Sequence, residues 1–387
     1  MNQSYQVIAA ICVLMCFANY QGADTQIDVV ADAKLIVDNN RAELIVMRII
    51  PFRTPEQRKQ INDHIRQLDY TPLIDPDYEP VTFSDPFTDS YLDLCYTLLT
   101  DDKNTILSKY MTYFLKAKNP SVIIILMLLV DDMGTFMKVY NSQHHDSFDE
   151  SRKHQMKNFR NMLRVWAESI RPPDGDIDQK AVDNEAGSLN DEKPKWDKNR
   201  DQLEKVLMKS SYKMAKAILE KYEEKNQHPI EDDIRATIKN PYLVDAYCSL
   251  ATYIKDKYTC LARKLHEQSD NEDHFATWNI LVGTLKSDEW KQIDTSFKRE
   301  NDNIGVVEFI SHNIKGDFVL METLAYLIDS TYKPKFLGVP APIATPKVPS
   351  SPSQPVSHLN VPTPPSVPST TVVTPPPSQT TSTNPSM

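Results

Sequence analysis

The sequence predicts an all-α protein built from four repeats, and three observations lead there. An apolar i,i+4 pair, which puts two side chains on one face of a helix, occurs four times: Ile61/Ile65, Phe136/Tyr140, Ile218/Tyr222 and Ile293/Phe297. Successive pairs lie 75, 82 and 75 residues apart, which indicates an internal repeat. A second apolar couplet precedes each pair by eleven and twelve residues, and no stretch alternates apolar and polar residues as a strand does.

A unit of about 75 residues is too long for the common solenoid repeats, but it holds about five helices of ordinary length. We expect seven parts along the chain: a signal peptide (1–23), repeats at 31–100 and 101–170, an acidic connector (171–198), repeats at 199–265 and 266–330, and a tail (331–387).

The N-terminal segment has the features of a secretory signal. Residues 7–18 form an uncharged apolar run of twelve, too short to span a bilayer and the right length for the apolar part of a signal peptide. We therefore expect a secreted, extracellular protein, with a buried N-terminal segment as the alternative.

Another apolar run, residues 122–130, falls in register with the second helix of its repeat. It is interpreted as a core helix, and no transmembrane segment is expected. Outside the signal region the cysteines are Cys95, Cys248 and Cys260, an odd number on apolar faces. Three buried thiols are favoured over a Cys248–Cys260 disulfide.

The third repeat shows the expected helices most clearly. Residues 199–227 carry one apolar stripe that we divide into two helices hinged near Ser210 and Ser211. Pro229 suits the first position of the next helix, whose first turn is acidic. Pro241 ends that helix, and residues 242–253 form the last one.

Charge restricts the possible partners. The chain has a formal net charge of −10, and because residues 331–387 carry three lysines and no acid, the remaining body stands at −13. Such a body should repel nucleic acid, and also an anionic membrane unless cations or a local basic patch intervene. The tail holds 15 of the 27 prolines and reads as a disordered segment: an O-glycosylated stalk, a polyproline ligand or a spacer.

At this point the sequence resembles the annexin family over residues 31–329. The acidic stretch 171–185 running into Lys195 and Trp196 looks like the opening of the annexin third repeat. Residues 229–234 and 313–318 look like the junctions before the last helices of the third and fourth repeats. The resemblance implies four five-helix repeats in a curved disc whose convex face meets membranes, binding phospholipid through calcium.

The calcium loops of that family, however, are poorly matched. The four loops align with residues 38–41, 117–120, 196–198 and 270–273, and none keeps the glycine that turns carbonyl groups toward the ion. The distal acid is replaced at three positions, by His154 or Gln155, by Ile238 and by Asn313, so that only Asp85 remains plausible. Lys118 and Lys198 put positive charge where the ion would sit. We expect calcium binding to be weak or absent.

Two other acidic groups are weak metal candidates. Asp174, Asp176, Asp178 and Glu185 occupy positions 1, 3, 5 and 12 of an EF-hand-like loop, but position 6 is not the required glycine. A helix-capping connector is the favoured interpretation. The other group is Asp270, Glu272 and Asp273, for which an exposed linker with a helix cap is favoured.

Trp196 has two interpretations. In the family, a tryptophan at this place can enter the membrane interface, where an indole is favoured. A tryptophan packed in the core explains the sequence equally well. Signatures of an enzyme are missing: no histidines at metal-ligand spacing, no nucleophile elbow, and 8 glycines in the whole chain.

These observations lead to a non-enzymatic, secreted, annexin-like protein without a required cofactor. The expected function is peripheral binding to anionic phospholipid surfaces with weak or absent calcium dependence. The alternative is an extracellular protein-interaction scaffold that keeps the fold without lipid or calcium binding.

Overall fold

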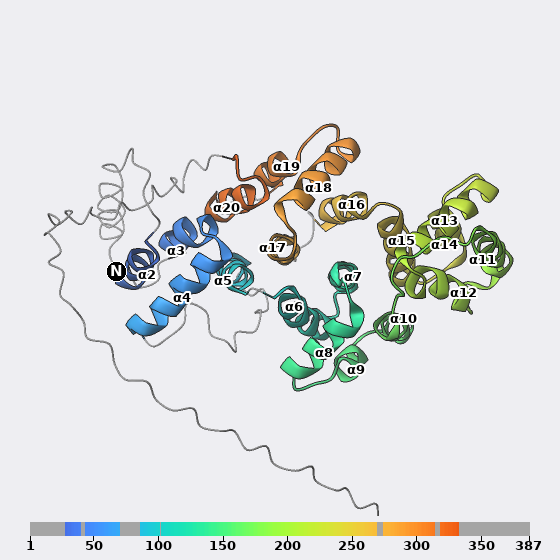
Figure 1. The fold of residues 1–387 in the computed structure, drawn as a ribbon, viewed down its shortest axis with the longest axis horizontal. Helices are drawn as coiled ribbons and strands as arrows, with labels where there is room; N and C mark the ends of the chain where they lie inside the picture. The colour runs from blue at the N-terminus through green and yellow to red at the C-terminus, as the bar shows by residue number, and fades with distance from the viewer. Residues whose placement is uncertain are drawn as a thin grey trace, which may run out of the picture. The chain divides into compact units, whose positions relative to one another are not determined.

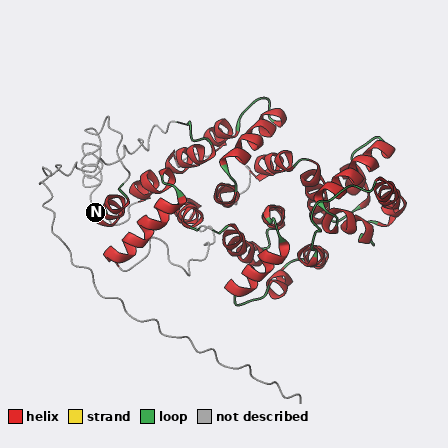
Figure 2. Cartoon of the chain, in the orientation of Figure 1, coloured by secondary structure: helices red, strands yellow, loops and turns green. Residues whose placement is uncertain are grey.

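The structure is a computed structural model that describes residues 28–39, 43–69, 86–100, 102–268, 274–313 and 318–332. Within these ranges every regular element is a helix and no strand occurs (Figure 2), which confirms the all-α class. The predicted signal peptide and nearly all of the predicted tail lie outside the described residues.

The helices fall into four consecutive groups along the chain (Figure 1). The first is α2 (Val29–Asp38), α3 (Glu43–Ile49), η1 (Ile50–Phe52), α4 (Pro55–Asp69) and α5 (Pro86–Leu99). The second is α6 (Lys103–Ala117), α7 (Pro120–Leu129), α8 (Met133–Gln143), α9 (Phe148–Ser151), η2 (Arg152–His154) and α10 (Lys157–Glu168). The third is α11 (Gln179–Glu192), η3 (Lys193–Lys195), α12 (Asp201–Glu204), η4 (Lys205–Lys209), α13 (Tyr212–Asn226), α14 (Ile230–Thr237) and α15 (Pro241–Lys255). The fourth is α16 (Lys257–Gln268), α17 (His274–Thr284), α18 (Ser287–Glu300), α19 (Val306–Asn313) and α20 (Phe318–Ile328).

The same helix pairing recurs in each group. The first long helix packs against the third in the pairs α2 with α4, α6 with α8, α11 with α13 and α16 with α18. The four apolar i,i+4 pairs of the sequence lie on α4, α8, α13 and α18, and all eight side chains are fully buried. The register of the predicted repeat is therefore confirmed at these positions.

Contacts between groups join the helices into one core. α5 of the first group packs on α17 of the fourth, and α15 of the third packs on α7 of the second. The two fully apolar faces of α7 make this possible, since every residue from Val122 to Leu129 is buried. This confirms the core interpretation of residues 122–130. In the described part of the chain, no helix has both the length and the apolarity needed to cross a membrane.

Local sequence signals explain where the helices of the third group begin and end. The helical segment ends at Ser210. Ser211 caps α13 by accepting a hydrogen bond from the Met214 amide, so the predicted hinge is confirmed. The segment before it, η4, is a π-helix. Pro229 stands at the N-cap of α14, one residue earlier than predicted. Pro241 occupies the first turn of α15.

The predicted connector is more ordered than its composition suggests. Residues 169–178 are non-helical, but residues 179–192 form α11, which packs on α13 through Val182, Ala186 and Leu189. These three side chains recur at helical spacing among polar residues, so the buried stripe is only one residue wide. Cys95, Cys248 and Cys260 are buried thiols outside any disulfide, as the favoured interpretation predicts.

Candidate functional site

The loops that align with calcium loops of annexins lie between the first and second helices of each group. Two of them, residues 117–120 and 196–198, are described completely. The loop at 38–41 is described only in part, and the loop at 270–273 lies outside the described residues, together with Asp270, Glu272 and Asp273. Asp85, the remaining candidate for a distal acid, also lies outside them.

The loop at 117–120 makes a tight turn without glycine. Lys118 takes the left-handed conformation at φ 59° and ends α6, and its amide donates to the Phe114 carbonyl. Asn119 then caps α7, its side chain accepting a hydrogen bond from the Val122 amide at 3.2 Å. The polar groups of this turn are thus largely paired with one another.

Gln155, which replaces a distal acid, ties this loop to the end of the same group. The side chain is buried, and its amide nitrogen donates to the carbonyl of Leu115 in the last turn of α6 at 2.7 Å. An amide supplies the donor that such a carbonyl lacks. The two segments that a metal ion would bridge are joined here by a direct hydrogen bond.

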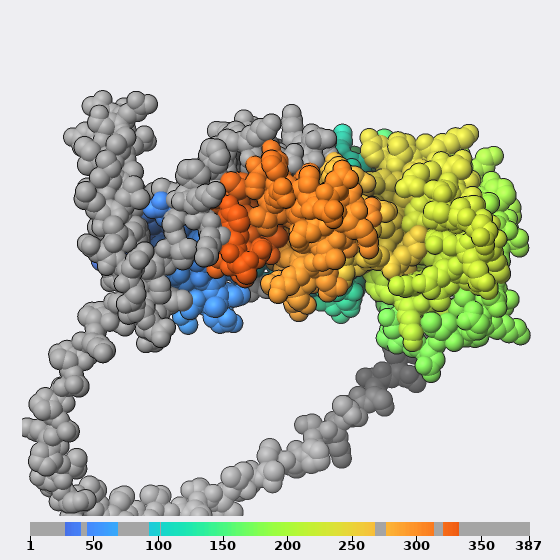
Figure 3. Space-filling model, turned by 90° about the horizontal axis from the view of Figure 1, so that it is seen from above, coloured from blue at the N-terminus to red at the C-terminus, as the bar shows by residue number. Residues whose placement is uncertain are grey.

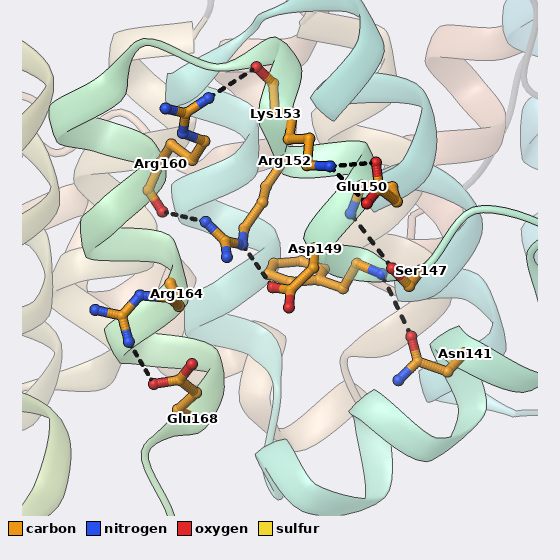
Figure 4. Close-up of polar contacts among 10 residues, drawn as sticks. Asn141, Ser147, Asp149, Glu150, Arg152, Lys153, Arg160, Arg164 and Glu168 are labelled. Atoms are coloured by element: carbon orange, nitrogen blue, oxygen red, sulfur yellow. Dashed lines mark hydrogen bonds and ion pairs between the residues drawn. The ribbon is translucent and has the colours of Figure 1, made fainter.

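Ion pairs hold the segment that carries Gln155 in place (Figure 4). Arg152 bridges the Asp149 carboxylate, at 2.7 Å, and the Arg160 carbonyl, at 3.4 Å. Lys153 contacts both carboxylate oxygens of Glu150 at 2.6 Å. The acids of this segment are therefore occupied by neighbouring cations.

In the loop at 196–198 an arginine side chain lies where a cation would bind backbone carbonyls. Nη1 of Arg200 donates to the carbonyls of Trp196 and Asp197 at 3.0 and 2.9 Å. The Asp197 carboxylate accepts a hydrogen bond at 3.1 Å from the backbone amide of Lys239, 42 residues further on. Loop and distal segment are again joined directly, with a guanidinium as the local positive charge.

The carboxylate of Glu204 lies near this guanidinium. It accepts a hydrogen bond from the Tyr247 hydroxyl at 2.6 Å. Burial raises the pKa of Glu204, and the bond from Tyr247 and the charge of Arg200 only partly oppose this. Burial, and then the Glu204 charge, raises the pKa of Tyr247. The half-buried Glu204 carboxylate is thus engaged with the hydroxyl of the buried Tyr247, and it lies beside the Arg200 guanidinium instead of facing an ion in the loop.

Trp196 lies in the core. Its side chain is 0% exposed and packs against the ring of Tyr222, with 6.4 Å between the ring centroids. The membrane-contacting interpretation of Trp196 does not fit this conformation, because the indole could reach a lipid surface only if the loop rearranged.

The connector acids do not converge on a common point. Asp178 caps α11, and Asp174 accepts a hydrogen bond from the Lys213 amide at the start of α13. Glu185 contacts Lys205 and Gln202, both at 2.6 Å. Burial alone would raise the pKa of Glu185, but the hydrogen bonds from Lys205 and Gln202 outweigh it and lower the pKa. Asp176 is exposed.

The EF-hand-like interpretation of Asp174, Asp176, Asp178 and Glu185 therefore finds no support in the geometry, since Asp174, Asp178 and Glu185 make separate contacts and do not converge on one point. Across the described ranges, no group of three or more histidine, cysteine, aspartate or glutamate residues is placed to hold a metal ion.

The loops at 117–120 and 196–198, with the distal segments that contact them, carry a group of exposed lysines. The sequence alone did not predict that these lysines belong to one surface. We define the basic loop surface by five exposed lysines: Lys116, Lys118, Lys157, Lys198 and Lys239. Within the described part of the chain, none of the five makes an ion pair.

Three contacts link the segments that carry these lysines. The Gln155–Leu115 bond places Lys157 near Lys116 and Lys118, and the Asp197–Lys239 bond places Lys239 near Lys198. The two halves meet where Phe159 at the start of α10 contacts Tyr242 at the start of α15. Two apolar side chains are exposed among the lysines: Met156 at 49% and Tyr242 at 36%.

Comparison with known proteins identifies the fold. No family model and no curated protein sequence matches the chain. Among solved structures, annexin III superposes with a TM-score of 0.65 at 18% identity, covering 78% of this chain and 94% of its own. Chicken annexin V in complex with zinc gives 0.65 at 17% identity, covering 79% and 97%. Calcium-bound alpha-1 giardin gives 0.57 at 14% identity, covering 78% and 99%. The chain has an annexin-like fold with a divergent sequence.

Calcium, which the resemblance to annexins leads one to expect, does not suit the two loops that are described. Lys118, the Gln155 amide and the Arg200 guanidinium are donors or cations, whereas calcium requires six to eight oxygen ligands. No binding step through calcium follows from these two loops.

Proposed function

We propose that this annexin-like chain is secreted and binds anionic phospholipid surfaces peripherally, without calcium at the two described loops. The observation that carries the proposal is the basic loop surface, whose five lysines have no carboxylate partner in the described residues. The net charge of −10 argues against binding to an anionic membrane only if the charges are spread evenly over the protein surface. Here a local excess of lysine meets the bilayer first.

Asp197, which accepts a hydrogen bond from the Lys239 amide, offsets one of the five charges, but three other neighbouring acids do not. Glu150 is paired with Lys153, Asp149 with Arg152 and Glu192 with Lys195. A lysine near an anionic surface contributes about 1 kcal/mol, and this contribution declines with salt. The exposed side chains of Met156 and Tyr242, neighbours in sequence of Lys157 and of the segment of Lys239, add apolar area.

Sedimentation with phosphatidylserine vesicles tests the proposal, in millimolar calcium and in a chelator. We expect equal binding in both, and loss of binding at high salt. The double variant Lys118→Gln/Lys198→Gln should weaken binding by about 2 kcal/mol, roughly 30-fold at low salt.

The matched control is Lys59→Gln/Lys180→Gln, which makes the same change in charge at exposed lysines of α4 and α11. Equal weakening in this control would mean that net charge, and not the surface, governs binding. Binding that appears only with calcium would overturn the proposal. No sedimentation in any condition would favour the protein-interaction scaffold.

A further inference from the structure

Two exposed apolar side chains lie at the start of corresponding helices. Met156 stands at the N-cap of α10 and Tyr242 in the first turn of α15, and these are the last helices of the second and third groups. Met156 is 49% exposed and Tyr242 36%. The buried ring of Phe159, one helical turn after Met156, contacts the ring of Tyr242, with 6.4 Å between the centroids. Phe159 thus connects the two side chains across the boundary between the groups.

The fold does not account for a methionine at position 156. An N-cap side chain usually accepts a hydrogen bond from an amide of the first turn, as Asn240 does for α15 from the Tyr242 amide at 3.1 Å. Met156 makes no such bond, and about half of its side chain is exposed, so it neither caps α10 nor fills the core. A side chain that contributes little to folding is available for a contact outside the protein.

The helices that carry the two side chains are held by several neighbours. α15 packs on α7 and α10 of the second group, on α13 and α14 of its own group and on α16 of the fourth. In the space-filling view its yellow residues lie against the orange residues of the fourth group (Figure 3). Because α10 and α15 contact each other, the fold sets the spacing of Met156 and Tyr242 before any partner binds.

The chemistry around the two side chains suits the boundary between lipid head groups and acyl chains. Lys157 follows Met156, and Lys239 precedes Tyr242 by three residues. Asp197, at the Lys239 amide, brings one carboxylate to the same border. A thioether is apolar and adaptable, and a tyrosine has an apolar ring with a polar hydroxyl, as is typical of side chains at a membrane interface. Lysines beside such side chains characterise a surface that lies in this boundary.

We propose that Met156 and Tyr242 form an apolar anchor that enters the head-group region of the bilayer. This inference rests on the proposed function and adds the side chains that penetrate the lipid, without calcium and with Trp196 remaining in the core. The lysines attract an anionic surface from a distance, whereas the apolar anchor contributes only on contact, in proportion to the apolar area removed from water. Its removal should therefore weaken binding although the net charge stays the same.

Tryptophan placed at the apolar anchor reports its insertion. All four tryptophans of the chain are buried, so the wild-type emission should not change on binding. In Met156→Trp and Tyr242→Trp we expect emission at shorter wavelength on phosphatidylserine vesicles in a chelator, and quenching by lipids brominated in the acyl chains. Leu68→Trp on α4 and Ile304→Trp between α18 and α19 are matched controls, because these side chains are 50% and 36% exposed. Their emission should stay unchanged.

Sedimentation measures how much the apolar anchor contributes. Met156→Gln/Tyr242→Gln should weaken binding to phosphatidylserine vesicles roughly tenfold, whereas Leu68→Gln/Ile304→Gln should bind as the wild type does. Circular dichroism checks that each variant is folded. Met156→Gln alone replaces the double variant if loss of the Tyr242 ring unfolds the protein.

The outcomes separate this inference from the proposed function. Sedimentation of the wild type, with unchanged emission from the tryptophans at 156 and 242, would refute the apolar anchor and leave the proposed function standing. Equal shifts in the control tryptophans would also refute it, because attachment would then not depend on these two side chains. If neither the wild type nor any variant sediments, both proposals fail.

Discussion

Replacing Gln155 by glutamate restores the acid that the annexin resemblance leads one to expect, and we predict that it destabilises the protein. The wild-type side chain is 6% exposed and donates to the Leu115 carbonyl at 2.7 Å. In Gln155→Glu an ionised carboxylate faces that carbonyl, so a donor is lost and the carbonyl is left unsatisfied. The expected loss in the free energy of unfolding near pH 7 is about 3 kcal/mol.

The predicted loss in the free energy of unfolding depends on pH. Burial raises the pKa of a carboxyl group, so the folded variant binds a proton more tightly than its unfolded chain does. The deficit should shrink as pH falls through this raised pKa, because the protonated carboxyl regains a donor. Urea unfolding followed by circular dichroism near pH 7 and near pH 5 measures it, with exposed Gln60→Glu as the control.

Calcium provides the second arm of the experiment. The loop lacks glycine and holds Lys118 in its turn, so the new carboxylate has too few oxygen partners for an ion. We expect millimolar calcium to leave the melting temperature of Gln155→Glu unchanged. A variant as stable as the wild type near pH 7, or one that calcium stabilises by several degrees, would show that the amide is not a substitute for the ion.

Three further predictions concern the core, the tail and the cysteines. Ile218→Ala and Ile293→Ala should each cost about 2–5 kcal/mol, measured by urea unfolding, because both side chains are fully buried at equivalent places in α13 and α18; near-neutral results at both would contradict the repeat register. Deleting residues 335–387 should leave the melting temperature unchanged, because a chain rich in proline, serine and threonine has few apolar side chains to bury; a fall of many degrees would show that the tail packs on the body. Burial raises the pKa of Cys248 and Cys260 to about 12, so at pH 8 a fraction of roughly 10⁻⁴ of each thiol is ionised and Ellman's reagent should react only after unfolding; fast reaction in the native protein would refute this.

Apolar periodicity was enough to predict the class, the repeat register and the hinge at Ser210, because these depend on which face of a helix is buried. It was not enough for α11. That helix buries a narrow stripe through Val182, Ala186 and Leu189, among acids and amides that also suit a linker. The polar composition of residues 179–192 led to the prediction of a connector, although the apolar spacing fits a helix. The packing of α11 on α13 shows that the segment is a helix of the third group.

The loops show a similar limit. Sequence alone indicates that ligands for calcium are missing, because glycine and distal acids are absent at aligned positions. It does not indicate what replaces them. Gln155 and Arg200 donate to backbone carbonyl groups, which every residue has, so no residue type in the sequence marks the partner. The contacts that link loop and distal segment in the basic loop surface span 40 and 42 residues, which spacing does not reveal.

The contact of Arg200 with the carbonyls of Trp196 and Asp197 has a consequence for control. A calcium ion exchanges with the medium, so a loop that holds one reports how much calcium surrounds it. A guanidinium fixed to the backbone is never diluted, chelated or released. The loop at 196–198 therefore does not respond to the calcium concentration. Under the proposed function, attachment to a surface then depends on the charge of that surface and on the surrounding salt.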